Sequence, residues 1–93
     1  MVYRLTRQAA EDVRSIYREG RRIFGKEQAD RYHAYLQSVF ELLSDNPKLA
    51  RERGEIEPPV RMHPCGSHLI VYNQHDEGGV LIIRIRHHRE NWQ

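Results

Sequence analysis

The 93-residue sequence has a single cysteine, Cys65, and no apolar run that approaches the roughly 20 residues of a membrane-spanning helix. One cysteine excludes a disulfide within the chain, which is typical of proteins from a reducing compartment. The first residues lack the charged-then-apolar order of a signal peptide, so we expect a cytoplasmic protein. Internal repeats are also absent, and the length suits one domain over residues 1–93 with one modest core.

Charge is nearly balanced over the chain but not along it. The formal net charge is only +2, yet residues 84–89 hold three arginines and two histidines without an acid. This cluster ends an apolar β-type segment, and it combines Arg, which binds carboxylates and phosphates in bidentate fashion, with a following Trp92. The sequence therefore predicts a basic binding edge rather than a generally basic protein.

Apolar residues at helical spacing predict two helices in the first half of the chain. Thr6 is a good N-cap for the first helix, and Gly25 ends it. The second helix is expected to begin at Lys26 or Glu27 and to end at Ser44, shortly before Pro47. Because one or two residues join them, the helices should pack as an antiparallel hairpin.

Short apolar segments predict strands around these helices. A short edge strand is expected over residues 2–5, and three antiparallel strands over residues 60–63, 67–73 and 80–87. The proline-containing segment 47–59 between them is predicted to be a surface loop. The fold class is therefore α+β, in the order β-α-α-β-β-β, with the helical hairpin packed on one face of a small antiparallel sheet.

Strict alternation assigns the two faces of the last strand. The predicted core face carries Leu81, Ile83 and Ile85. The opposite face carries two apolar residues followed by two cations, namely Val80, Ile82, Arg84 and Arg86. Two interpretations of that second face stay open: loops or the C-terminal tail cover it, or a partner binds it.

Residues with metal-binding or nucleophilic chemistry occur near the second predicted strand. His63, Cys65 and His68 are close in sequence, but their spacing matches no strong zinc pattern. Cys65 is expected to be a buried, unreactive thiol. We therefore predict no metal, no cofactor and no catalytic residue.

Several short motifs, in this order, resemble the ParE toxins of the ParE/RelE toxin–antitoxin superfamily. They cover nearly the whole chain: Tyr3-Arg-Leu-Thr-x-x-Ala-x-x-Asp12-Val, Phe24-Gly25, Gln28-Ala-x-x-Tyr32, Asn46-Pro47, Arg61, Gly66-Ser67-His68-Leu-Ile-Val-Tyr72 and Ile83-Arg84-Ile-x-His87-x-Arg89. Two positions depart from the common pattern, since Arg86 replaces an aliphatic residue and Val60 an aromatic one.

The resemblance implies a growth-inhibiting toxin that is neutralised by a ParD-like antitoxin in a toxin–antitoxin hetero-oligomer. ParE members are known as poisons of DNA gyrase, whereas their RelE cousins cut mRNA in the ribosome. The RelE type usually carries a C-terminal tyrosine, and no tyrosine follows Tyr72 here. We therefore expect this chain to bind gyrase rather than to act as an enzyme, with an mRNA endoribonuclease as the alternative.

Two sets of residues are predicted to contact these partners. The target-binding set is basic or aromatic and consists of Arg61, His68, Arg84, Arg86, His87, Arg89 and Trp92. The antitoxin-binding set is apolar, since a hairpin groove suits an antitoxin helix, and consists of Tyr17, Phe24, Tyr32, Leu36, Val80 and Ile82.

Overall fold

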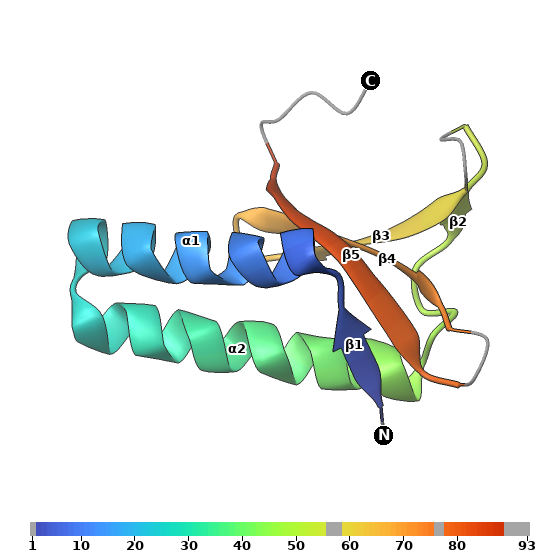
Figure 1. Ribbon diagram of the computed structural model, residues 1–93, viewed down its shortest axis with the longest axis horizontal. Coiled ribbons are helices and arrows are strands. Elements are labelled where there is room, and N and C mark those ends of the chain that lie inside the picture. The colour runs from blue at the N-terminus through green and yellow to red at the C-terminus, as the bar shows by residue number, and fades with distance from the viewer. Residues whose placement is uncertain (1, 56–58, 76–77, 89–93) are drawn as a thin grey trace.

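The computed structural model describes residues 2–55, 59–75 and 78–88. Figure 1 shows a helical hairpin packed against a single sheet. The elements in chain order are β1 (Tyr3–Leu5), α1 (Arg7–Phe24), α2 (Lys26–Asp45), β2 (Glu52–Arg53), β3 (Val60–Cys65), β4 (His68–Gln74) and β5 (Val80–His87). This α+β arrangement confirms the predicted fold class and the predicted helical hairpin.

Local signals set the bounds of the two helices. The Thr6 hydroxyl oxygen accepts a hydrogen bond from the Ala9 N–H at 3.0 Å, which caps the start of α1. Gly25 separates the helices with φ of 93°, a conformation that side-chain-bearing residues rarely adopt. The chain therefore reverses within one residue, and the hairpin follows directly from this sequence.

The sheet has the strand order β1-β5-β4-β3-β2. The antiparallel pairing of β3, β4 and β5 was predicted, but two features differ. First, β1 runs parallel to β5, so the sheet is mixed rather than antiparallel. The two helices between these strands provide a crossover long enough for parallel pairing. Second, the expected loop contains β2, which pairs with Val60 and Arg61 through its backbone and has no apolar alternation to reveal it.

A bulge in β5 corrects the predicted faces of the last strand. Val71 pairs with Arg84 whereas Tyr72 pairs with Ile82, so Ile83 is an extra residue opposite β4. One inserted residue shifts the alternation, and core residues then occur on both sides of the bulge. The buried residues are Val80, Ile82 and Ile85, which are exposed by 1%, 0% and 3%. The prediction was right for Ile85 and wrong for Leu81 and Ile83, which are half-buried.

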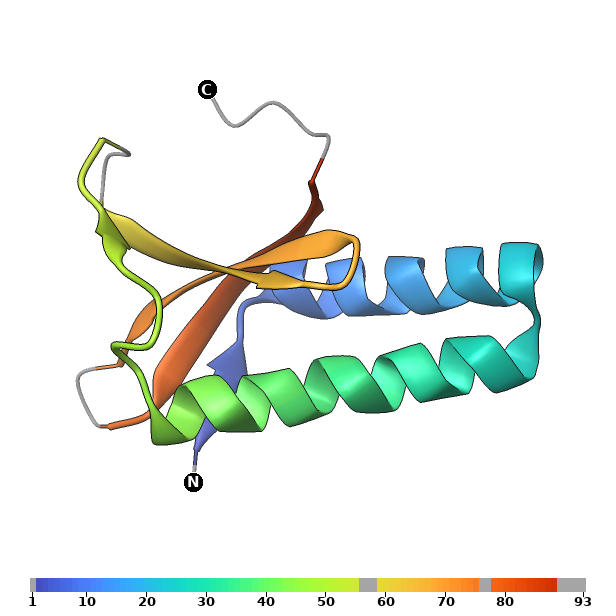
Figure 2. The ribbon, with the colours of Figure 1, turned by 180° about the vertical axis from the view of Figure 1, so that it is seen from behind.

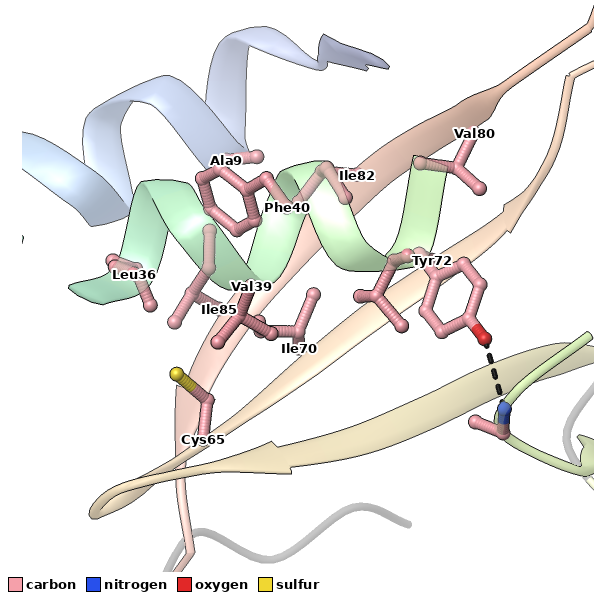
Figure 3. Close-up of a cluster of buried hydrophobic side chains, with 12 residues drawn as sticks. Ala9, Leu36, Val39, Phe40, Cys65, Ile70, Tyr72, Val80, Ile82 and Ile85 are labelled. Carbon is pink, nitrogen blue, oxygen red and sulfur yellow. Dashed lines mark hydrogen bonds between the residues drawn. The ribbon is translucent and has the colours of Figure 1, made fainter. Parts of the chain in front are cut away.

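The core fills the space between α2 and the sheet (Figure 3). Leu36 and Phe40 of α2 pack with Ile70 and Ile85 of the strands, and burial of each such side chain contributes about 1.5–3 kcal/mol. Tyr72 is fully buried, but its hydroxyl group donates to the Pro47 carbonyl at 3.0 Å and accepts from the Ala50 N–H at 3.1 Å. These bonds attach the loop after α2 to the core. They also satisfy the buried hydroxyl.

Residues at the start of α1 cover the edge of β5 beyond β1. The pairing with β1 involves only Val80 to Ile82. Beyond this point the Thr6 hydroxyl donates to the Ile83 carbonyl at 2.7 Å, and an Asp12 carboxylate oxygen accepts from the Ile85 N–H at 3.0 Å. Side chains of α1 therefore replace a neighbouring strand, and they protect an edge that would otherwise expose unpaired backbone groups.

Candidate functional site

The helical hairpin and the β3–β4 turn enclose a groove of about 520 Å³. Figure 2 shows this turn extending toward the helical layer, and the hairpin continuing beyond the sheet. Both helices and two strand ends supply the lining, which includes Val13, Ile16, Tyr17, Phe24, Tyr32, Leu36, Ser67, His68 and His87. In the described part of the chain this lining contains no Lys or Arg, and Glu19 is its one acid. The groove is thus mainly apolar and aromatic.

Four residues predicted to contact the antitoxin lie together in this groove: Tyr17, Phe24, Tyr32 and Leu36. Phe24 is 62% exposed near the tip of the hairpin, and its neighbour Ile23 is 54% exposed. Leu36 is buried at 1% exposure and belongs to the core below the groove. The groove therefore offers exposed apolar surface at its outer end and rests on the core at its inner end.

Tyr32 attaches α2 to the β3–β4 turn. Its hydroxyl group is 3.1 Å from the Cys65 carbonyl oxygen, to which it donates, and 2.7 Å from His68 Nδ1. Burial raises the pKa of Tyr32, so its phenol stays protonated and can donate. Gly66 permits this contact, because a Cβ atom there would lie 2.7 Å from the Tyr32 hydroxyl oxygen. Gly66 also has φ of 59°, which provides a second reason for glycine.

Two predicted target-binding histidines meet at the strand end of the groove. His68 and His87 are register partners on β4 and β5, and their rings pack edge to face with centroids 5.5 Å apart. The His68 ring also packs against Tyr32 at 5.6 Å. A third imidazole, His33, packs against Tyr17 at 5.8 Å. The structure therefore brings candidates from both predicted sets into one groove.

Arg84 forms a fold-supporting ion pair. Its Nε and Nη2 atoms donate to the two Asp12 carboxylate oxygens at 2.8 and 3.2 Å. The expectation that Arg84 presents its cation to a partner does not fit this geometry, because Asp12 neutralises the guanidinium group while it also accepts from the Ile85 N–H. With side chains exposed by 29% and 17%, the pair is partly shielded from water. Arg84 thus connects α1 to β5.

Arg61 likewise has a partner within the fold. Its Nη1 atom donates to the Ala50 carbonyl at 2.6 Å, on the same loop that Tyr72 holds through the Ala50 N–H. Arg61 is half-buried, and it stands opposite Tyr72 in the β3–β4 register. Its position therefore fits anchoring of the loop after α2.

The remaining target-binding candidates divide into two groups. Arg86 is half-buried and pairs in register with Leu69, so it lies on the alternate side of β5 from Ile85. Arg89 and Trp92 lie outside the described residues. In the described residues, the target-binding candidates that remain in the predicted basic edge are thus Arg86 and His87.

Val80 and Ile82 are not surface residues. The expectation that they face an antitoxin is wrong, because both side chains belong to the core and are exposed by at most 1%. The bulge at Ile83 explains the error, since alternation counted back from Ile85 assigns them to the opposite face.

Cys65 and the nearby histidines show no arrangement for metal binding or nucleophilic attack. Cys65 is 1% exposed, and burial raises the pKa of its thiol, which disfavours the reactive thiolate. Among residues 2–55, 59–75 and 78–88, no group of three or more His, Cys, Asp or Glu side chains is placed to hold a metal ion. No helix of the described chain has the length and apolar character needed to cross a membrane.

Three contributors to this region were missed from the sequence: Asp12, Ile23 and His33. Asp12 had a usable signal, because it borders the apolar stripe of α1, where a carboxylate is half-buried. Ile23 belongs to the same apolar stripe and precedes Phe24 at the hairpin tip. His33 had no signal, since only the fold places its ring beside Tyr17.

These features define a class: small α+β proteins in which a helical hairpin packs on a sheet and frames an apolar groove. The same fold occurs in a solved chain described as "Chromosomal ParDE TA system from P. aeruginosa", with a TM-score of 0.79, 21% identity, and coverage of 94% of this chain and 95% of that one.

The family follows from the sequence. Residues 3–92 match the model of the "ParE toxin of type II toxin-antitoxin system, parDE", and the chain belongs to this family. Toxin ParE1 of Mycobacterium tuberculosis is 33% identical over 71% of this chain and 67% of its own length. Toxin ParE1 of Caulobacter vibrioides is 30% identical over 96% and 91%, and Toxin ParE of Escherichia coli is 31% identical over 94% and 84%.

Proposed function

We propose that this chain inhibits growth by binding DNA gyrase, and that a ParD-like antitoxin neutralises it by occupying the groove in a toxin–antitoxin hetero-oligomer. The observation that carries this proposal is the groove itself. It joins exposed apolar residues at the hairpin tip, such as Phe24, to His68 and His87 at the strand end. Membership of the ParE family supports the same function.

The groove fits one face of an amphipathic helix. Its lining is apolar or aromatic, and the described residues give it neither Lys nor Arg. A partner helix would bury its apolar side chains against Ile23, Phe24 and the Tyr17 ring, in the helix-in-groove mode. Aromatic side chains with large accessible area commonly provide most of the binding energy in such interfaces.

Neutralisation then follows because the antitoxin-binding and target-binding surfaces overlap. His68 and His87 line the same groove as Tyr17 and Tyr32. An antitoxin helix seated between the hairpin and the β3–β4 turn would cover both imidazoles. If gyrase contacts this end of β5, the two partners exclude each other, and the antitoxin needs no second site.

Gyrase contact is assigned to Arg86 and His87, together with Arg89 and Trp92 as sequence-based candidates. Arg84 and Arg61 are excluded from this role because their guanidinium groups bind Asp12 and Ala50. In this assignment the toxin acts by binding gyrase, and it cleaves no bond itself. It is supported by the family, whose name is shared by the relatives above.

The test is a supercoiling assay with purified gyrase, relaxed plasmid and purified toxin, with and without the antitoxin encoded beside the toxin gene. We expect inhibition by toxin alone and recovery on addition of antitoxin. The variant Arg86→Ala should lose inhibition, and its melting temperature is measured alongside because Arg86 is half-buried and its Nε atom is buried. Loss of inhibition by a folded variant supports the assignment, and full inhibition by a folded variant contradicts it. Lys48→Ala, which removes an exposed cation beside α2, is the control and should inhibit normally.

Full gyrase activity in the presence of folded toxin would overturn the gyrase assignment. Translation arrest with cleaved mRNA on ribosomes would instead establish the endoribonuclease alternative. Inhibition that persists when the antitoxin is bound would overturn the overlap between the two binding surfaces.

A further inference from the structure

A row of arginines follows the solvent-facing side of α1, opposite the buried Ala9. Arg7, Arg14, Arg18 and Arg21 are all exposed. At about 100° per residue they fall within an arc of about 60°, and from Arg7 to Arg21 they span about 21 Å along the helix axis. The buried residue of the same helix is Ala9, which lies on the other side. We call these four residues the arginine row.

The arginine row has few partners within the fold. In the described residues, Arg14 pairs with Glu11 at 2.9 Å, and both side chains are about 60% exposed, at 58% and 60%. Such an exposed pair is worth at most about 1 kcal/mol and exchanges readily with another anion. Arg7, Arg18 and Arg21 take part in none of the ion pairs found among the described residues. Asp12 turns away from the row toward Arg84.

Helix stability accounts for only part of the row: Arg21 stands in the last turn, where the helix dipole favours a cation, and Arg14 pairs with Glu11. The first turn of α1 contains no acid, and Arg7 stands at this end, where the helix dipole disfavours a positive charge. Arg14 and Arg18 are like charges spaced i,i+4, a pair that destabilises a helix by a few tenths of a kcal/mol. These charges therefore point to an anionic partner outside the chain.

We propose that the arginine row binds the phosphate backbone of duplex DNA. Arg forms bidentate contacts with phosphate, and a straight row of four matches a regularly charged polyanion. The large exposed apolar residues of α1 are Ile23 and Phe24, and both lie outside the arc. A protein partner would need an apolar centre to its interface, whereas a phosphate backbone needs none.

This proposal goes beyond gyrase and antitoxin binding. The groove residue Ile16 lies on the opposite side of α1 from the row, whereas Tyr17 borders the row at about 40° from Arg21. The row itself is outside the groove lining, so a toxin held by its groove could contact DNA with the arginines at the same time. DNA binding by the row requires neither partner, so it can be measured with the toxin alone.

The experiment measures fluorescence anisotropy of a labelled duplex of about 25 base pairs and arbitrary sequence, titrated with the full chain at several salt concentrations. The test variant is Arg7→Gln, Arg14→Gln, Arg18→Gln combined, since Gln is a good helix former. The matched control is Arg31→Gln, Lys48→Gln, Arg51→Gln, at exposed positions outside the row. Each triple variant lowers the formal net charge from +2 to −1. Circular dichroism establishes that both variants fold.

We expect the wild type to bind DNA with an affinity that falls steeply as salt rises. Loss of three phosphate contacts should reduce the slope of log K against log salt by about 2–3 and weaken binding at least about tenfold at low salt. The control should retain most of the wild-type slope. No DNA binding by the wild type at low salt overturns the proposal, as does equal weakening by both triple variants, which would indicate a net-charge effect. Equally tight, row-dependent binding of poly-glutamate would also overturn it, in favour of an acidic protein segment.

Discussion

The carboxylate of Asp12 accepts two hydrogen bonds from the Arg84 guanidinium group and a third from the Ile85 N–H. One side chain of α1 thereby neutralises the first arginine of the basic segment and closes the open edge of β5 directly after the bulge. This relationship divides the basic segment into a structural residue, Arg84, and candidates for binding. It also connects the helical hairpin to the strand that carries His87.

Removal of the Asp12 carboxylate should destabilise the fold. Asp12→Ala leaves Arg84 without its ion pair and the Ile85 N–H without its acceptor, and we expect a loss of about 2–3 kcal/mol in the free energy of unfolding. Urea denaturation measures this loss. Glu11→Ala removes the neighbouring exposed carboxylate, whose pair with Arg14 should contribute less than about 1 kcal/mol. Equal stability of the two variants would show that the Asp12 contacts are not structural.

The bulge predicts different losses of stability on truncation of Ile83 and Ile85. Ile85→Ala empties a core position that is 3% exposed and should cost about 2–4 kcal/mol by cavity formation. Ile83→Ala truncates a half-buried side chain at the bulge and should cost less than about 1.5 kcal/mol. Chemical denaturation of both variants checks the order. A larger loss of stability for Ile83→Ala than for Ile85→Ala would contradict the bulge and support the strict alternation predicted from the sequence.

Gly66 should be sensitive to substitution for two separable reasons. Gly66→Ala introduces a Cβ atom 2.7 Å from the Tyr32 hydroxyl oxygen and places alanine at φ of 59°. We expect a loss of about 2–3 kcal/mol, of which the backbone strain contributes about 1–2 kcal/mol. In a Tyr32→Leu background only the strain should remain, so a double-mutant cycle separates the two terms. Full additivity would show that the ring moves away without cost.

Antitoxin binding should depend on the exposed end of the groove. Phe24→Glu places a charge in the apolar lining and should weaken binding of the cognate antitoxin at least about tenfold, as expected for an aromatic anchor. Leu42→Glu makes the same kind of change at a position that is 44% exposed but outside the groove lining. Isothermal titration calorimetry should find this control close to the wild type. Equal weakening by both substitutions would place the interface elsewhere.

His63 should contribute to the loss of stability at acidic pH. Burial lowers the pKa of His63 below its ordinary value of 6.5, so below that value the unfolded chain binds more protons than the folded chain. The associated stability is fully present above about pH 6.5 and is lost as the pH falls toward the folded-state pKa. His63→Gln should therefore lose less stability than the wild type between about pH 7.5 and about pH 5.5. Denaturation at both pH values measures the difference, and identical losses would exclude this role.

The sequence determined the local features of this protein. Thr6, Gly25 and the helical spacing of apolar residues specified the hairpin, because capping and backbone conformation act over a few neighbouring residues. Apolar segments around a tight turn likewise specified β4 and β5. The order of elements and the α+β class followed from these signals, and residue-by-residue resemblance indicated the family.

Only the tertiary structure decided the features that depend on distant contacts. The bulge at Ile83 exchanges core and surface residues of β5, and the parallel pairing of β1 with β5 makes the sheet mixed. Neither could be predicted, because alternation within one strand contains no information about its neighbour's register. The role of Arg84 was decided in the same way: the sequence placed it among the target-binding residues, whereas in the fold it forms an ion pair with Asp12. Long-range packing therefore determined which of the predicted site residues support the fold and which line the groove.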